Sequence, residues 1–252
     1  MKTLTDSNDP SFDPIRKIRG DHPDYLMIEG ENAIEHTLKY GVQIHTLFFD
    51  NDILEKIPET QKITNKYFAN RKLLKEVMGF NFHRHAVGLA DRIPYHQLDP
   101  TEGPFLILNS LTSPENVGTL IRTAKAFGIK SILFDRESCS PYVRRCLRVS
   151  IGHTFGLHIT RSDSLAQEIG LLKKNNVQVI ALETAPNACT LTDTVMGNKT
   201  ALILGSEGHG IEKNLLELCD QITQIEMPHN IGSLNVAQSG AIALYQLSQN
   251  LY

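Results

Sequence analysis

The sequence predicts an α/β fold in two modules, of which the C-terminal one is built on a parallel sheet. Short apolar runs, typical of strands buried on both faces, alternate with helix-length segments through the C-terminal half. Residues 96–104 are rich in proline and glycine, which is the composition of a linker. We therefore expect a small N-terminal module at residues 21–95 and a larger module at residues 105–252.

The N-terminal part begins with a segment, residues 1–20, that contains few apolar side chains and two Asp-Pro pairs. We expect this segment to be a flexible lead-in. The module that follows alternates short strands with helices. Its expected strands lie at 26–28, 44–49 and 85–90, and its expected helices at 32–40 and 70–77.

The larger module begins with the apolar run Phe105–Leu108. Ser113 and Pro114 are suited to start a helix, and Gly128 is suited to end it. Further strands are expected at 131–134, 177–182, 200–204 and 222–227. Helices are expected at 114–127, 142–149, 164–174, 212–218 and 234–249.

The composition is that of an ordinary globular protein, with 252 residues, 41% of them hydrophobic and 21% charged. No apolar run approaches the roughly 20 residues that a membrane span needs, and the N-terminus lacks a signal-peptide core. The four cysteines are scattered without a C-x-x-C pair. We therefore expect a cytoplasmic protein with free thiols, no disulfide framework and no metal site.

The net charge of −3 argues weakly against a non-specific binder of polyanions. Basic residues nevertheless gather in three places. These are Arg144, Arg145 and Arg148 with Arg136 nearby, His83-Arg84-His85, and Arg71, Lys72 and Lys75. A solvated surface explains each cluster alone, but a protein that reads one structured nucleic acid can be neutral overall and basic on one side.

Polar residues follow three of the expected strands, at the place where ligands of α/β proteins gather. Five side chains stand out there: Asn116, Arg122, Glu207, Ser233 and Asn235. Each place has a plain structural explanation, as the solvent side of a helix, a glycine-rich turn or a helix cap. Their occurrence together in one module favours a shared ligand site.

These three places resemble the motifs of the SpoU (TrmH) family of RNA 2′-O-ribose methyltransferases, in the SPOUT superfamily. The matching segments are Asn116-x-Gly118-x-x-x-Arg122, Leu204-Gly205-x-Glu207-x-x-Gly210, and Ile225-x-Met227 followed by Ser233-Leu234-Asn235-Val236. They occur in the family's order and spacing. The first module is similar, more weakly, to the substrate-binding domain often attached to this family.

The resemblance implies a SPOUT-type parallel sheet with a deep trefoil knot, an RNA substrate-binding domain at residues 21–95, and a homodimer whose active site is completed across the interface. It implies S-adenosylmethionine as cofactor and structured RNA as substrate, with rRNA favoured over tRNA because of the additional domain. The cofactor-binding residues would be Leu204, Gly205, Glu207, Ile225, Met227 and Leu234. The catalytic residues would be Asn116, Arg122, Glu207, Ser233 and Asn235.

Methyl transfer requires a ribose 2′-hydroxyl that is aligned with the sulfonium methyl and loses its proton. Because a guanidinium stays protonated, we expect Arg122 to bind the adjacent phosphate and stabilise the developing alkoxide rather than to act as a base. Three positions depart from the family's third motif: Glu226, His229 and Ala237. They affect the expected loop shape and RNA preference.

Two other classes of function stay open. A non-catalytic RNA-binding protein on the same fold is disfavoured by the complete set of motif residues. A nucleotide-using oxidoreductase is disfavoured because the sequence lacks the dinucleotide G-x-G-x-x-G fingerprint.

Overall fold

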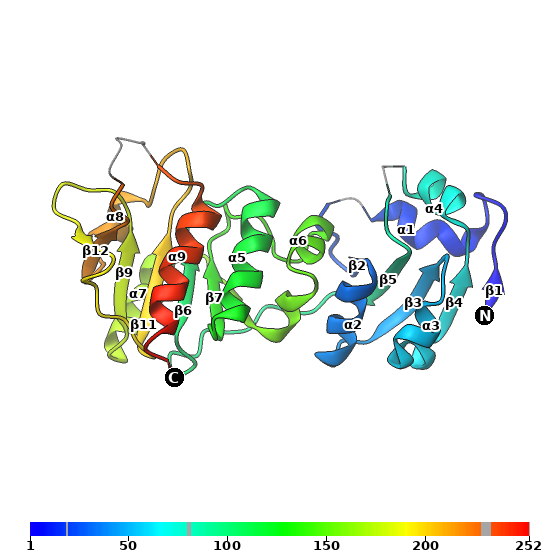
Figure 1. The fold of residues 1–252 in the computed structure, drawn as a ribbon, viewed down its shortest axis with the longest axis horizontal. Coiled ribbons are helices and arrows are strands. Elements are labelled where there is room, and N and C mark those ends of the chain that lie inside the picture. Colours follow the sequence, from blue (N-terminus) through cyan, green and yellow to red (C-terminus); the bar gives the residue numbers. More distant parts are fainter. Residues whose placement is uncertain (19, 80–81, 228–232, 252) are drawn as a thin grey trace. The chain divides into compact units, whose positions relative to one another are not determined.

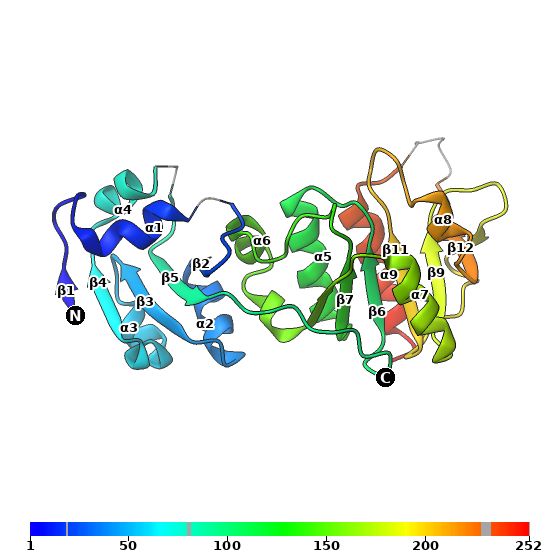
Figure 2. The ribbon, with the colours of Figure 1, turned by 180° about the vertical axis from the view of Figure 1, so that it is seen from behind.

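A computed structural model describes residues 1–18, 20–79, 82–227 and 233–251 and divides the chain into two compact units. Unit 1 comprises Met1–Pro94 and Ser140–Gly156, and unit 2 comprises Tyr95–Cys139 and Leu157–Tyr252 (Figures 1 and 2). Each unit has a β-sheet and a hydrophobic core of its own.

Unit 1 is built on a five-stranded mixed sheet. Its strands are β1 (Lys2–Thr3), β2 (Tyr25–Glu29), β3 (Ile44–Phe49), β4 (Asn65–Phe68) and β5 (Ala86–Asp91). Their order is β1-β4-β3-β5-β2, with β5 antiparallel to both of its neighbours. Its helices are α1 (Asp13–Lys17), α2 (Glu31–Lys39), α3 (Ile53–Lys56), α4 (Arg71–Met78) and α6 (Arg144–Val149).

The expectation of a flexible lead-in is wrong, because the first residues belong to the core of unit 1. Strand β1 pairs with β4, and Phe12 is fully buried with its ring stacked on that of Phe48 at a centroid distance of 5.3 Å. The two Asp-Pro pairs start short helices instead of marking a loose chain. Asp9 accepts a hydrogen bond from the Ser11 amide, and Asp13 opens α1. The few apolar residues of this segment therefore anchor it.

The helix expected at 142–149 forms as α6, but it belongs to unit 1 and not to the C-terminal module. An ion pair holds it there, since Arg144 Nη1 donates to Glu29 Oε2 at 2.8 Å and the Glu29 side chain is 1% exposed. The same segment continues to Ile151, whose carbonyl lies 2.8 Å from Nδ1 of His36. Helical periodicity shows which face of a helix is buried, and not which unit buries it.

Unit 2 contains a seven-stranded sheet in which all pairs are parallel. Its strands are β6 (Phe105–Leu108), β7 (Ser131–Phe134), β8 (His158–Arg161), β9 (Gln178–Leu182), β10 (Cys189–Thr190), β11 (Thr200–Leu204) and β12 (Gln221–Gln224). Their order is β10-β12-β9-β11-β6-β7-β8. The helices are α5 (Pro114–Ala126), α7 (Leu165–Lys174), α8 (Lys213–Leu216) and α9 (Val236–Ser248). The α/β class and the parallel C-terminal sheet are thus confirmed.

Helices cover both faces of this sheet, α5 and α9 on one side and α7 and α8 on the other (Figures 1 and 2). Since side chains of a strand alternate between faces, Ile203 of β11 packs with α7 and α8, whereas its neighbour Leu204 meets α9. Gly240 permits this contact. A Cβ atom there would lie 2.4 Å from Cδ2 of Leu120 on α5 and 2.8 Å from Cδ1 of Leu204.

Two further expectations concern the segments 96–104 and 228–232. Residues 96–104, expected as a linker, run along the edge of unit 2, where the His96 amide donates to the Ile159 carbonyl at 2.8 Å. The expected loop Pro228–Gly232, which includes His229, lies outside the described residues, and the threading of a knot stays a prediction. None of the helices formed by the described residues is both long and apolar enough to cross a membrane.

Candidate active site

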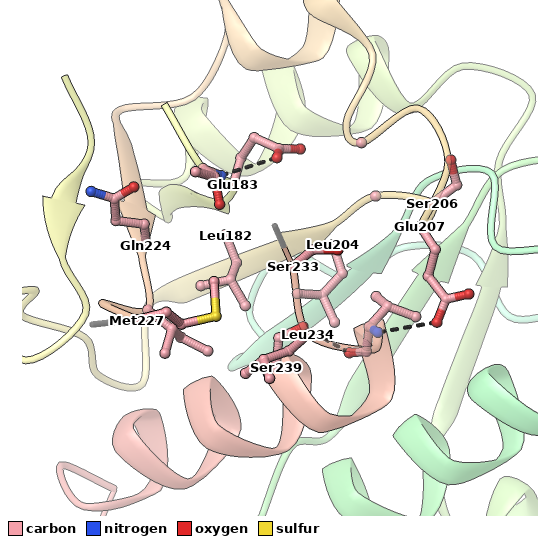
Figure 3. A pocket seen from close by; sticks show the side chains of 15 residues that line it. Leu182, Glu183, Leu204, Ser206, Glu207, Gln224, Met227, Ser233, Leu234 and Ser239 are labelled. Carbon is pink, nitrogen blue, oxygen red and sulfur yellow. Dashed lines mark hydrogen bonds between the residues drawn. The ribbon is translucent and has the colours of Figure 1, made fainter. Parts of the chain in front are cut away.

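A hollow lies at the carboxyl ends of β9, β11 and β12 in unit 2 (Figure 3). Strand β12 ends at Gln224, three residues before the end of the expected strand, so that Ile225 and Met227 line the hollow instead of pairing. All six residues that the motifs assign to a cofactor lie on this lining: Leu204, Gly205, Glu207, Ile225, Met227 and Leu234. Ser233, at the start of the chain segment that enters α9, lies there too.

The loop after β11 has a shape that two of its glycines make possible. Ser206 and Gly210 exchange backbone hydrogen bonds of 3.1 and 2.9 Å, which close the loop. A Cβ atom on Gly205 would lie 2.2 Å from the carbonyl carbon of Gly210, and Gly210 itself has a φ of 69°. Gly208, by contrast, has open space where a Cβ would stand. The closed loop presents Glu207 toward the start of α9.

The three motifs meet at one carboxylate oxygen. Glu207 Oε1 accepts hydrogen bonds from Nδ2 of Asn116 at 3.1 Å, from Nδ2 of Asn235, and from the amide of Val236 at 3.4 Å. Nδ2 of Asn235 also donates to Oδ1 of Asn116 at 3.1 Å. A negative group at the N-terminus of α9 is favourable because the helix dipole is positive there. These bonds join side chains that are far apart in the sequence, and we call this set the Glu207 cluster (Asn116, Glu207, Asn235).

Asn235 has two functions in the structure. Its Oδ1 accepts from the amides of Ala237 and Gln238 at 2.9 and 3.4 Å, which makes it the N-cap of α9. Its Nδ2 belongs to the Glu207 cluster. The cap explanation that the sequence left open is therefore correct for Asn235, but it accounts for only half of the side chain.

A second hollow adjoins the first and shares Ser206, Glu207 and Val236 with it. Its remaining described lining is Ser110, Leu111, Thr112, Ser113, Asn116, Glu137, Gly208 and His209. Several of these are small hydroxyl side chains near the start of α5. The Glu207 cluster thus stands between an apolar and carboxylate-lined hollow and a hydroxyl-lined one, which allows two ligands to approach each other there.

Of the five predicted catalytic residues, Arg122 is the one that the structure does not bring to this place. It is exposed on α5, about two turns beyond Asn116, and lines neither hollow. The sequence showed that these two residues do not share one stripe of the helix, because six positions turn the helix by about 240°. A single chain therefore contains an incomplete set of motif residues at the site.

Sequence reasoning missed a polar network beside the second hollow, in which Asn109 is buried, Asp135 half-buried and Glu212 exposed. Asn109, 1% exposed, donates through Nδ2 to Asp135 at 2.8 Å and to Glu212 at 2.9 Å, and its Oδ1 accepts from the Glu212 amide at 2.9 Å. Asp135 also accepts from the amide of Ser110 at 2.8 Å. Asn109 and Asp135 directly follow β6 and β7, so the rule that polar residues gather at strand ends would have found them.

Sequence reasoning also missed Glu183, which the same strand-end rule would have found. It directly follows β9, lines the first hollow and accepts a hydrogen bond from the Ile211 amide at 3.0 Å. The first hollow thus offers apolar side chains, backbone groups and carboxylates. This combination of groups fits a flat, apolar base joined to a cationic centre, as in S-adenosylmethionine.

Comparison with known proteins decides the family. The profile of the SpoU rRNA Methylase family matches residues 103–245, which is more than half of the chain. The chain belongs to this family. It is therefore a SpoU-family RNA methyltransferase, and the methyl donor of this family is S-adenosylmethionine. The matched range contains the whole Glu207 cluster and both hollows.

For two of the similar proteins, the similarity to this SpoU-family chain extends beyond the matched range. An uncharacterized tRNA/rRNA methyltransferase of Mycobacterium tuberculosis is 25% identical over 266 residues, covering 99% of this chain and 92% of the relative. A 23S rRNA (guanosine-2′-O-)-methyltransferase of Yersinia pestis is 29% identical and covers 60% of this chain and 61% of the relative. The AdoMet-bound rRNA methyltransferase of Sinorhizobium meliloti shares the fold, with a TM-score of 0.83 at 24% identity over 98% of this chain and 97% of the other.

Proposed function

We propose that this SpoU-family enzyme transfers the methyl group of S-adenosylmethionine to a ribose 2′-hydroxyl in structured RNA, with rRNA favoured over tRNA. The observation that carries the proposal is the Glu207 cluster, which joins all three motifs between two adjoining hollows. The relative from Yersinia pestis, which is named for 2′-O-methylation of 23S rRNA, supports the choice of atom and of RNA. The enzyme would act in the cytoplasm, where such RNA is found.

In this proposal the first hollow holds the cofactor. Leu182, Leu204 and Leu234 would surround the adenine, and the closed loop from Gly205 would contact it through the backbone. The bound cofactor supplies an electrophilic methyl group. Its sulfonium is cationic, and the carboxylate of Glu207 lines the hollow.

The second hollow would hold the target nucleotide. Its hydroxyl side chains and the amide of Asn116 are groups that can hydrogen-bond a ribose. Asn116 and Asn235 are fixed by their bonds to Glu207, so they would orient the 2′-hydroxyl without rearrangement during the reaction. Ser233, at the edge of the first hollow, would help to shape the passage between the two ligands.

Arg122 would act at the active site of a second protomer. Its exposed position outside both hollows supports this arrangement, as does the exposed apolar surface of α9, where Ile242 and Tyr245 are 44% and 54% exposed. We therefore propose a homodimer in which the partner's Arg122 grips the phosphate next to the target ribose. A guanidinium suits this task because it offers several donors in one plane.

Mixed dimers test this arrangement. Arg122→Ala and Asn235→Asp each inactivate their own dimer. When the two variants are unfolded together and refolded, half of the dimers are mixed and each mixed dimer has one intact site, so about one quarter of wild-type activity returns. If Arg122 acts within its own chain, no mixed dimer has an intact site and no activity returns.

Unit 1 would be the RNA substrate-binding domain. The three basic clusters of the sequence fall within it, including the arginines of α6, whereas the neighbouring Arg136 belongs to unit 2. The buried Glu29 pairs with Arg144 and lies 3.9 Å from Arg148, and these contacts hold the two arginines of α6 in place. Binding to RNA should weaken steeply with salt, and Arg84→Ala and Arg145→Ala should each lower the salt slope by about 1.

The proposed reaction is tested with RNA from a strain that lacks the gene. The purified enzyme is incubated with that RNA and S-adenosylmethionine labelled in the methyl group, and the RNA is digested to nucleosides. We expect label in a 2′-O-methylated nucleoside from rRNA, and none with Arg122→Ala. Label in a base contradicts the ribose assignment, and label confined to tRNA contradicts the choice of RNA.

A further inference from the structure

The described lining of the first hollow carries two carboxylates and no lysine, arginine or histidine. Glu183 follows β9 and Glu207 lies in the loop after β11, and both are drawn in Figure 3. Because β9 and β11 are neighbours in the sheet, the two carboxylates reach the hollow from adjacent strand ends. Under the proposed function, in which this hollow holds S-adenosylmethionine and on which this inference rests, the hollow is negative where its ligand is cationic.

Glu183 is held firmly at the rim of this hollow. Its Oε2 accepts from the Ile211 amide and its Oε1 from the Thr184 amide, both at 3.0 Å. Its own amide donates to the Thr223 carbonyl at 2.9 Å. The carboxylate also packs against Gly210, where a Cβ would lie 2.4 Å from Oε2. Each oxygen keeps a lone pair after these bonds, so the carboxylate of Glu183 is held in place at the hollow without being neutralised by a cationic side chain of the described lining.

Methyl transfer changes the charge of the cofactor. The methyl–sulfur bond breaks, its electron pair stays on sulfur, and the methyl carbon bonds to the ribose oxygen while the hydroxyl proton passes to solvent. The sulfonium donor thus becomes a thioether whose sulfur is neutral. Apart from the methyl group the two molecules have the same shape, so charge is the main property by which a pocket can tell them apart.

We propose that Glu183 is a specificity-determining residue which, together with Glu207, makes the hollow prefer the sulfonium donor to the thioether product. The spent cofactor then leaves more readily than fresh donor does. For a carboxylate about 6 Å from a cation at a partly exposed site, Coulomb attraction corresponds to a preference on the order of three- to tenfold. The motifs of the sequence assign no task to Glu183.

Calorimetric titration without RNA tests this inference. S-adenosylmethionine, S-adenosylhomocysteine and the amine analogue sinefungin are titrated into the wild type, Glu183→Gln and a control, Glu217→Gln. The control removes the same charge from an exposed position of unit 2 that lines neither hollow. Glutamine keeps the shape of the side chain and an oxygen that can accept the Ile211 amide.

We expect Glu183→Gln to bind the two cationic ligands three- to tenfold more weakly and the neutral thioether within about twofold of the wild type, by the Coulomb argument above. The preference of the wild type should shrink at high salt. Equal weakening of all three ligands, complete loss included, would show that Glu183 only braces the loop and would overturn the inference. An unchanged preference would overturn it too. Since no RNA is present, either result leaves the assignment of the RNA substrate untouched.

Discussion

Replacing Asn235 by aspartate separates the two functions of this residue. Asparagine and aspartate are comparable N-caps, so the substitution keeps the oxygen that accepts from the Ala237 and Gln238 amides. It replaces the donor that faces Glu207 and Asn116 with a second negative oxygen. Asn235→Asp therefore leaves the cap of α9 intact and converts an attraction within the Glu207 cluster into a repulsion.

The expected cost follows from three contributions. A hydrogen bond to a charged group contributes about 1.5–3 kcal/mol, and the exposure of Asn235 and Glu207 places this one at or below the lower end. Two like charges about 4 Å apart in water repel by about 1 kcal/mol. The helix dipole of α9 returns about 0.3–1 kcal/mol to a new negative charge at its N-terminus. The net loss is about 1–2 kcal/mol, or a fall in Tm of about 2–8 °C.

Thermal unfolding of four proteins measures this quantity: the wild type, Asn235→Asp, Glu207→Gln and the double variant. In the double variant the amide and the carboxylate have exchanged places, so a donor again faces an acceptor. We expect it to recover most of the stability that Asn235→Asp loses, with a coupling free energy of about 1–2 kcal/mol. If the losses of the single variants simply add, Asn235 and Glu207 do not interact as described.

Three further predictions concern the rest of the molecule. Asn109→Asp places a third carboxylate at a buried position beside Asp135 and Glu212, so the free energy of unfolding by urea should fall by about 3 kcal/mol at pH 7 and by less at pH 5, because burial and repulsion raise the pKa of the new group and protonation relieves both. Gly240→Ala should cost about 1–3 kcal/mol and weaken cofactor binding, whereas Gly170→Ala, which has open space, should stabilise α7 by about 0.5–1 kcal/mol. Burial raises the pKa of the Cys219 thiol to about 11, so alkylation at pH 8 followed by mass spectrometry should modify the exposed Cys189 first.

The sequence was sufficient for the parallel sheet of unit 2, because strands buried on both faces leave continuous apolar runs such as Phe105–Leu108. It was insufficient where tertiary contacts alone decide against which unit a segment packs. The pattern of α6 shows an amphipathic helix, and contacts with unit 1, such as the ion pair of Arg144 with the buried Glu29, explain where that helix packs. Residues 1–20 have too few apolar side chains to suggest a core, yet Phe12 is fully buried.

The site shows the same division. The motifs named the members of the Glu207 cluster, since each lies beside a strand end. They did not reveal that a single oxygen of Glu207 joins Asn116 to Asn235, because side-chain directions depend on the packing of α5 against α9. They also suggested that Arg122 belongs to the same place, whereas helix geometry puts it outside both hollows. Symmetry between protomers, which a sequence does not display, is our explanation for that distance.

The central claim is that the hollow at the ends of β9, β11 and β12 holds S-adenosylmethionine, and calorimetric titration of that cofactor tests it most directly. Ser239 lines the hollow from α9, so Ser239→Phe fills it, whereas Gln249→Phe adds the same ring at an exposed position that lines neither hollow. We predict one binding site per chain for the wild type and for Gln249→Phe, and none for Ser239→Phe. A wild-type protein that binds no S-adenosylmethionine, or a Ser239→Phe variant that binds it unchanged, would contradict the account.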